Sequence, residues 1–266
     1  MQTQPNMSKQ RILIDAGKFA LLILSLAFII ARGMTSLGYH WQWYRVPRYL
    51  FAFGSEGFAP GPLLEGLMVT LRITAVSMVL AFLIGLATVL LRLSGSFSAQ
   101  AVSRAYLELI RNTPLLIQLF FLYFVISPIV GMDAYASAVL ALSLFEGAYI
   151  SEIIRSGILG IPNGQWEAAL SSGMNAWETY RMVILPQAVR NILPPLTSQA
   201  ISLIKDSALV STIAIYDLTM QGQAIVSETF LAFEIWLTVA FIYLTLTITL
   251  SMLANGMEKR LKRIHG

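Results

Sequence analysis

Six mostly apolar stretches recur along the chain, and short polar segments separate them. A helix that crosses a hydrocarbon core of about 30 Å needs about 20 residues, at about 1.5 Å per residue. The pattern therefore predicts an all-α integral membrane protein with about six transmembrane helices, at residues 12–31, 67–91, 107–129, 136–154, 188–204 and 230–254.

The first stretch is short, because its most apolar part covers only residues 19–31. A cleaved secretory signal is the alternative interpretation, since Lys9, Arg11 and Lys18 precede an apolar run of signal-peptide length. We favour a retained helix, because Arg32-Gly33-Met34 does not form a small-x-small cleavage site.

The fifth stretch is the least hydrophobic of the six. It carries polar side chains around a pair of prolines: Arg190, Asn191, Pro194, Pro195, Thr197, Ser198 and Gln199. Polar side chains and carbonyls freed by proline need partners at membrane depth. We therefore expect this helix to contact protein rather than lipid.

Composition agrees with a membrane protein. The 266 residues are 56% hydrophobic and 12% charged, with a mean hydropathy of +0.70 and no cysteine. Soluble domains carry roughly 25% charged residues, so an ordinary soluble enzyme is excluded. The net charge of +4 does not indicate nucleic acid, because the cations lie in short segments between apolar stretches rather than in one basic patch.

The distribution of lysine and arginine predicts the orientation. A cytoplasmic N-terminus leaves few basic residues outside, namely Arg32, Arg45, Arg48, Arg72 and Lys205. Six spans then return the C-terminal segment Lys259-Arg260-Leu261-Lys262-Arg263 to the cytoplasm. The outer segment 39–53 is rich in Trp and Tyr, which is typical of a membrane interface.

The polar segment 155–190 lies on the cytoplasmic side of this topology and predicts a helical hairpin. Pro162-Asn163 offers a helix start, residues 165–172 are helical in pattern, and Gly173 suits a left-handed stop. Asn175 can cap a second helix, with Glu178 completing a capping box. We expect this second helix to run towards Leu185, before Pro186 interrupts it.

The same segment resembles the EAA loop of the membrane permeases of bacterial ABC importers. The likeness rests on Glu167-Ala168-Ala169, Gly173, Val183 where Ile is usual, and Leu185-Pro186. The resemblance implies that residues 157–186 form a coupling loop that docks on an ATPase subunit, through Glu167, Ala168, Ala169, Gly173, Leu185 and Pro186. A capped hairpin without a docking role is the alternative, with Glu167 as a solvated carboxylate.

Further motifs resemble permeases for polar amino acids. They are Arg111-Asn112-Thr113-Pro114-Leu115 with Gln118-Leu119-Phe120, then Ala148-Tyr149, Glu152-Ile153 and Arg155, then Lys205-Asp206-Ser207 and Leu209-Val210-Ser211. The resemblance implies a five-helix importer domain at residues 62–262 in the bacterial cytoplasmic (inner) membrane, preceded by an extension, residues 1–61, with one helix and an outer loop. It also implies an ATPase dimer, a second permease subunit and an extracytoplasmic solute-binding protein as partners.

A solute path should be lined by polar groups at membrane depth, where an ionised side chain costs about 2.5–3.5 kcal/mol. Glu146 is the first candidate, with Tyr149 and Ser143 three residues away on its helix face. It could meet the ammonium of an amino acid or an internal cation such as Arg190. Helix-packing hydrogen bonds explain the other candidates equally well: Asn112, Thr113, Gln118, Gln199 and Asp206.

The sequence offers no chemistry for an enzyme. It lacks the GxxxxGK[ST] motif that cradles nucleotide phosphates, so ATP would be used by a partner subunit and no cofactor is expected on this chain. The two histidines, His40 and His265, form neither a metal site nor a catalytic triad. An ion-coupled secondary amino-acid transporter is the alternative function, although such proteins usually contain an internal repeat that we do not find here. A membrane scaffold is a third possibility.

Overall fold

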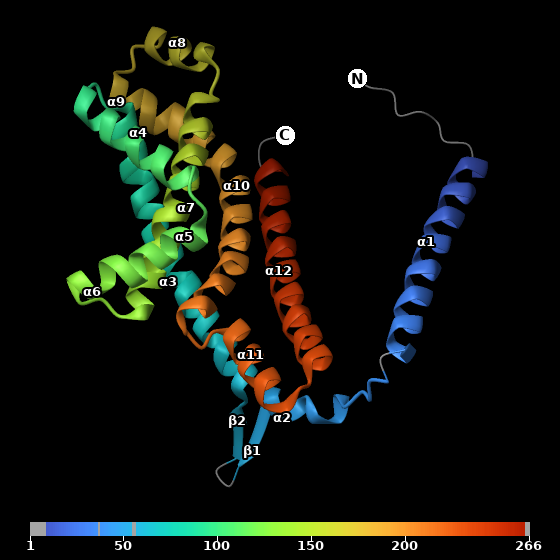
Figure 1. Cartoon of the computed structure of the whole chain (residues 1–266). Coiled ribbons are helices and arrows are strands. Elements are labelled where there is room, and N and C mark those ends of the chain that lie inside the picture. Colours follow the sequence, from blue (N-terminus) through green and yellow to red (C-terminus); the bar gives the residue numbers. More distant parts are fainter. Residues whose placement is uncertain (1–8, 37, 55–56, 264–266) are drawn as a thin grey trace. The chain divides into compact units, whose positions relative to one another are not determined.

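The computed structural model describes residues 9–36, 38–54 and 57–263, and the chain forms two compact units that divide between Trp43 and Tyr44 (Figure 1). The first unit contains α1 (Lys9–Ser36), a helix of 28 residues that includes the first predicted stretch. Several of its apolar side chains are exposed, among them Phe19, Leu21 and Leu24.

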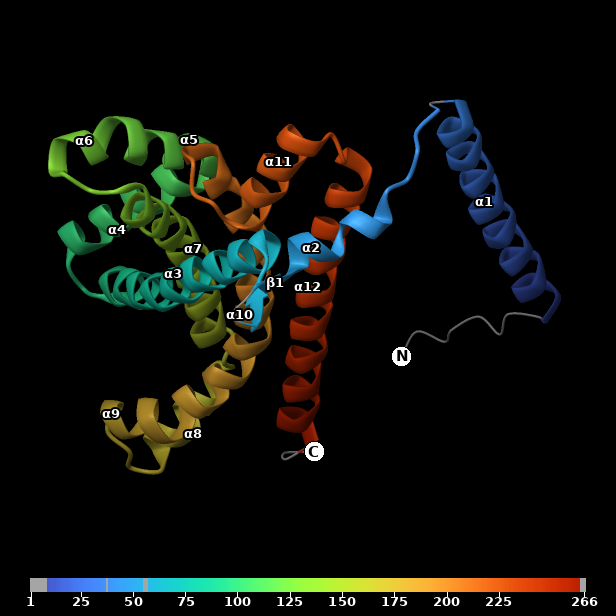
Figure 2. The same ribbon diagram turned by 90° about the horizontal axis from the view of Figure 1, so that it is seen from below.

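The second unit is built around α3 (Pro62–Leu93) and α7 (Ala134–Leu159), which pack along each other (Figure 2). Glycines permit their close approach. A Cβ added to Gly85 would lie 2.8 Å from Ile150 Cγ2, and one added to Gly147 would lie 2.9 Å from Ile84 Cγ2. Small residues at the contact are a typical means of helix association in membranes.

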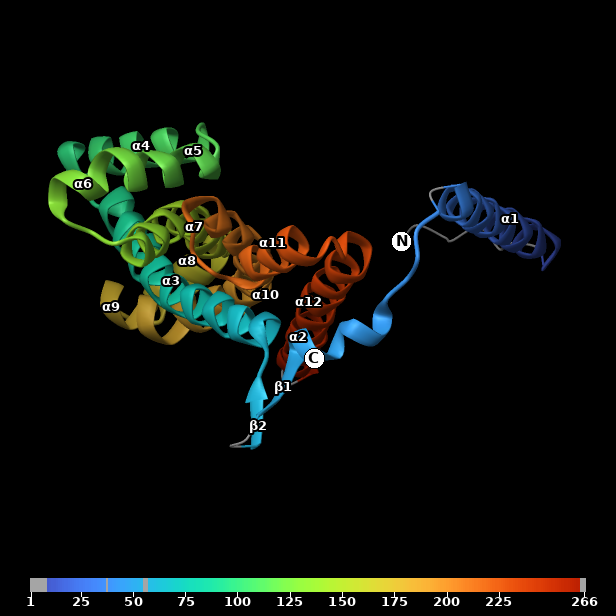
Figure 3. The same ribbon diagram turned by 60° about the horizontal axis from the view of Figure 1, so that its bottom comes forward.

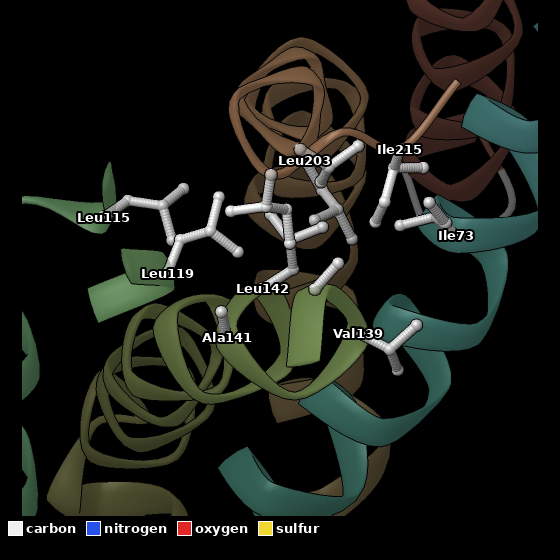
Figure 4. Close-up of a cluster of buried hydrophobic side chains, with 11 residues drawn as sticks. Ile73, Leu115, Leu119, Val139, Ala141, Leu142, Leu203 and Ile215 are labelled. Atoms are coloured by element: carbon white, nitrogen blue, oxygen red, sulfur yellow. The ribbon is translucent and has the colours of Figure 1, made fainter. Parts of the chain in front are cut away.

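One buried apolar cluster joins α3, α5 (Leu115–Phe120), α7 and α10 (Leu185–Asp206). Figure 4 shows Leu119 of α5, Leu142 of α7 and Leu203 of α10 meeting within it, with Ile73 and Ile215 to one side. Because these side chains come from segments far apart in the sequence, their burial holds α5 and α10 against α7.

The prediction of a continuous third span at residues 107–129 is wrong. α4 (Phe97–Arg111) and the segment Leu115–Val130 are bent by 106° at a short break. Pro114 explains the break, because proline disfavours helical geometry in the preceding residue and has no backbone N–H to donate. Beyond α5 the chain continues through a π-helical segment (Phe121–Ile126) and α6 (Ser127–Val130).

Among the described residues, three helices are long and apolar enough to cross a membrane: α3, α7 and the Ala232–Gly256 part of α12 (Ala232–Arg263). The bent pair Phe97–Arg111 and Leu115–Val130 could supply a fourth span. α10 contains the predicted fifth stretch and both of its internal prolines, but it is not one of the three. The helical membrane fold is confirmed, whereas the total of six spans stays a prediction.

Several short elements have no counterpart in the sequence-based prediction. β1 (Phe51–Gly54) follows α2 (Pro47–Leu50) and pairs antiparallel with β2 (Gly57–Pro60), which places Phe51 opposite Pro60. α11 (Leu218–Thr229) packs against α3 and α12 (Figure 3). Asp217 caps α11, since its Oδ1 accepts the Met220 N–H at 2.8 Å.

We expect Gly85→Ala to lower the free energy of unfolding by about 1–3 kcal/mol, because the added methyl group overpacks the contact between α3 and α7. Thermal unfolding of the protein in detergent measures the change. Gly256→Ala is the matched control, because nothing lies within 4 Å of a Cβ at that helical position. Equal losses of stability in the two variants would contradict this account of the packing.

Asp217 predicts a pH dependence of stability. Burial raises the pKa of Asp217 from 3.8 to about 6, against the opposing effect of the Met220 N–H. Because the folded-state pKa is the higher one, this contribution to stability is complete below about pH 4 and is lost as the pH rises through about 6. Asp217→Asn keeps a side-chain oxygen for the cap.

We therefore expect Asp217→Asn to melt at a higher temperature than the wild type at about pH 8, and the advantage to shrink as the pH falls towards about 4. Melting curves recorded in one detergent across this range test it. A constant difference between the two proteins at every pH would show that Asp217 does not titrate in this way.

Candidate functional site

The predicted helical hairpin is confirmed, whereas its cytoplasmic position stays a prediction. α8 (Asn163–Ser171) is followed by Gly173 with φ of +83°, the left-handed conformation that glycine adopts without strain. A complete capping box then starts the next helix: Asn175 Oδ1 accepts the Glu178 N–H at 3.0 Å, and Glu178 Oε2 accepts the Asn175 N–H at 2.9 Å. Figure 1 shows α8 at the end of the second unit opposite β1 and β2.

The expectation that Pro186 would interrupt the second helix is wrong. α9 (Ala176–Glu178) passes into a π-helical segment (Thr179–Ile184), and α10 begins directly afterwards at Leu185. The π-helical segment changes the register of the backbone hydrogen bonds just ahead of Pro186. Pro186 itself lies in the first turn of α10, where a missing N–H donor is tolerated. The helical path therefore continues without a stop.

The residues of the EAA resemblance divide between two places. Glu167, Ala168 and Gly173 are exposed on the hairpin, and Glu167 has no hydrogen bond or ion pair within the described ranges. Ala169 is buried. Three residues earlier on α8, the ring of Trp166 packs edge-on against that of Tyr180, with 4.8 Å between the ring centroids. A second group, Leu185 and Pro186, is exposed at the start of α10.

Several exposed apolar side chains on the hairpin escaped the sequence analysis, among them one on α8 and one on α9. Leu170 of α8 and Trp177 of α9 are 56% and 69% exposed. Leu170 directly follows Ala169, the buried residue of α8, and adjacent residues of a helix do not share a face, which was the signal available in the sequence. Glu167, Ala168 and Leu170 are exposed on α8, whereas Trp177 lines a cavity together with residues of α3, α7 and α10.

Glu146 is fully buried in α7. Its Oε2 accepts a hydrogen bond from Gln199 Nε2 of α10 at 2.5 Å, so Gln199 takes the place in which Arg190 was considered. Its Oε1 has no hydrogen-bond partner in the part of the chain that the structure describes. Asp206, at the end of α10, is a second carboxyl group that interacts with Glu146. Three of the predicted path residues thus come together.

The remaining path candidates lie elsewhere. Gln118 of α5 folds back over the break after α4, and its Nε2 lies 2.8 Å from Ile110 O and 2.8 Å from Thr113 Oγ1. Asn112 donates to Glu108 O at 2.8 Å. These contacts brace the bend, but the buried Gln118 Oε1 has no partner among the described residues. Tyr149 packs its ring on Phe145, with 5.1 Å between centroids.

A cluster of charges around Glu152 is the feature that sequence reasoning missed most completely. The carboxylate of Glu152, in α7, meets arginines from three helices: Arg92, Arg111 and Arg155. The sequence showed only the three-residue spacing of Glu152 and Arg155. The partners from α3 and α4 could not be identified before the fold was known.

Comparisons with known proteins give the family. Residues 93–263 match the family described as "Binding-protein-dependent transport system inner membrane component". The glutamine transport system permease protein GlnP of Escherichia coli (strain K12) is 40% identical over 203 residues, which cover 75% of this chain and 93% of that protein. The L-cystine transport system permease protein TcyB of Bacillus subtilis (strain 168) is 40% identical over 205 residues, which cover 76% and 88%.

Solved structures agree with this assignment. The crystal structure of an amino acid ABC transporter with histidines is 40% identical and has a TM-score of 0.71, with 75% of this chain and 94% of that chain covered. An inward-facing MetNI methionine ABC transporter, 24% identical with a TM-score of 0.63, shares the fold over 75% and 95% of the two chains. The chain belongs to the family of binding-protein-dependent transport system inner membrane components.

Proposed function

We propose that the chain is the membrane-spanning permease subunit of an ATP-driven importer that moves polar amino acids by alternating access. The observation that carries the proposal is the capped hairpin at the end of α7, which presents Glu167 and Ala168 to the outside of the unit. The partners in this proposal are a cytoplasmic ATPase dimer that receives the hairpin, a second permease subunit and an external solute-binding protein. The chain itself binds no cofactor.

The same geometry supports the proposed orientation. Figures 1 and 2 show α12 ending on the side of the second unit where α8 lies. If α8 meets a cytoplasmic ATPase, the basic C-terminal segment is cytoplasmic as well, as the distribution of lysine and arginine predicts. With six spans the N-terminus is also cytoplasmic, and β1 and β2 face the outside.

The proposed solute class follows from the buried acceptors. Gln118 Oε1 and Glu146 Oε1 are buried without a donor in hydrogen-bond geometry among the described residues, with the Asp206 carboxyl group as a further neighbour of Glu146, and an unpaired buried acceptor costs about 1–3 kcal/mol. An amino acid brings an ammonium group that can donate to such oxygens. The similar proteins are described as a glutamine permease, a cystine permease and a transporter with histidines, which supports polar amino acids as the solutes.

Two hairpin variants test coupling. Glu167→Lys reverses the charge on the exposed face, and Gly173→Val forces a branched side chain into a left-handed conformation at a cost of about 1–2 kcal/mol. We expect each to reduce ATP-dependent uptake about tenfold or more, within the range of coupling between sites, while the protein still reaches the membrane. Gly164→Ala, on α8 with nothing within 4 Å of the added Cβ, should transport normally.

Uptake of radiolabelled L-glutamine, L-cystine and L-histidine into vesicles containing the complete transporter is the measurement. Normal uptake by both hairpin variants would refute the coupling role. Uptake that follows an ion gradient and ignores ATP would instead establish a secondary transporter.

Glu146→Gln tests the solute path. It preserves the shape of the side chain but removes the negative charge that would attract an ammonium group, so we expect KM for uptake to rise about tenfold, equivalent to about 1.4 kcal/mol. Asp217→Asn is the matched control, because it neutralises another fully buried acid outside the path. An unchanged KM for Glu146→Gln would show that this carboxyl group is purely structural.

A further inference from the structure

Glu152 holds three arginines with both oxygens of one carboxylate. Oε1 accepts from Arg92 at 2.5 Å and from Arg111 at 3.2 Å. Oε2 accepts two bonds from Arg155, from Nε at 3.1 Å and from the terminal nitrogen at 3.0 Å. The cluster therefore connects the end of α3, the end of α4 and the C-terminal half of α7.

The three arginines are not held equally. The side chains of Arg92 and Arg155 are 26% and 30% exposed. Arg92 makes one short hydrogen bond to Glu152, and Arg155 makes two. Arg111 is 47% exposed and has one longer contact, to an oxygen that it shares with Arg92. One negative charge cannot neutralise three positive charges, so repulsion from the other two weakens the hold on Arg111. The Arg111 contact is the one that opens most easily.

The position of this contact links two parts of the molecule. Arg111 is the last residue of α4, directly before the break that Gln118 and Thr113 brace. Glu152 lies on α7, about 9 Å along the helix from Glu146, and α7 leads into the hairpin. A displacement of the hairpin transmitted along α7 would act on the bend between α4 and α5 through this ion pair.

We propose that the Arg111–Glu152 ion pair opens and re-forms during the transport cycle. While it is closed, it positions the bend between α4 and α5 against α7. Arg111 is a positioning residue: through Glu152 it couples movement of α7 to the helix that carries Gln118. The inference rests on the proposed importer function. A purely structural alternative exists, because arginine at a helix C-terminus also interacts favourably with the helix dipole.

The ratio of solute imported to ATP hydrolysed separates these two roles. In vesicles containing the complete transporter with its ATPase and solute-binding partner, and with L-glutamine, L-cystine or L-histidine as the solute, we expect Arg111→Gln to lower this ratio about tenfold while ATP hydrolysis stays near the wild-type rate. Arg111→Lys keeps the charge and should recover part of the ratio. Arg104→Gln, an exposed arginine earlier in α4, should match the wild type.

A wild-type ratio in Arg111→Gln, or an equal loss in Arg104→Gln, would overturn the proposal. A wild-type complex that neither imports these solutes nor hydrolyses ATP would instead refute the proposed function itself. Should Arg111→Gln fail to assemble, spin labels at Ala105 and Ser156, both exposed, report the separation of α4 and α7 without altering the ion pair. We expect that separation to differ between the ATP-free and the ATP-trapped complex. Identical distance distributions would overturn the proposal that the ion pair opens.

Discussion

The close contact between α3 and α7 is the interaction on which the rest of the structure depends. Gly85 and Gly147 allow two backbones to approach where any larger side chain would separate them. α7 carries Glu146, then Glu152, and then leads into the hairpin with Glu167. Since α7 bears the candidate solute group and the charge cluster and then leads into α8, its placement against α3 positions both groups and the start of the hairpin.

A second constraint is the satisfaction of polar groups away from water. Most buried hydroxyls in these helices bond to a carbonyl one turn earlier, as Thr74 does to Thr70 O at 2.7 Å. Four buried side-chain atoms among the described residues have no hydrogen-bond partner, namely Gln118 Oε1, Glu146 Oε1, Thr179 Oγ1 and Asp217 Oδ2, and the first two belong to path candidates. An apolar environment makes unpaired acceptors costly, which is the physical basis of the proposal that a solute donates to Glu146 and Gln118.

Local signals predicted the local structure well. The hairpin, the left-handed Gly173 and the Asn175–Glu178 capping box depend on residues within a few positions of one another, so the sequence contained the necessary information. Pro186 shows the limit of a local rule, because the π-helical segment before it allowed the helix to continue. The bend at Pro114 shows the opposite error, since apolar composition masked a strong local breaker.

Contacts between segments that are distant in the sequence could not be predicted from it. The Gln199 partner of Glu146 lies 53 positions away, and the Arg92 partner of Glu152 lies 60 positions away. Periodicity places such residues on a helix face but does not say which faces meet. The pairing of β1 with β2 and the formation of α11 likewise depend on packing against α2, α3 and α12.

The most direct test of the account is a crosslink from the hairpin. The chain has no cysteine, so Ser172→Cys provides a single thiol beside Gly173 on the exposed end of α8. We expect a thiol-reactive crosslinker at this position to capture a soluble ATPase from the native membrane, identifiable by mass spectrometry, and to do so less in Glu167→Lys. Recovery of the chain with no ATPase attached, together with uptake that ignores ATP, would contradict the central claim that α8 is a coupling surface.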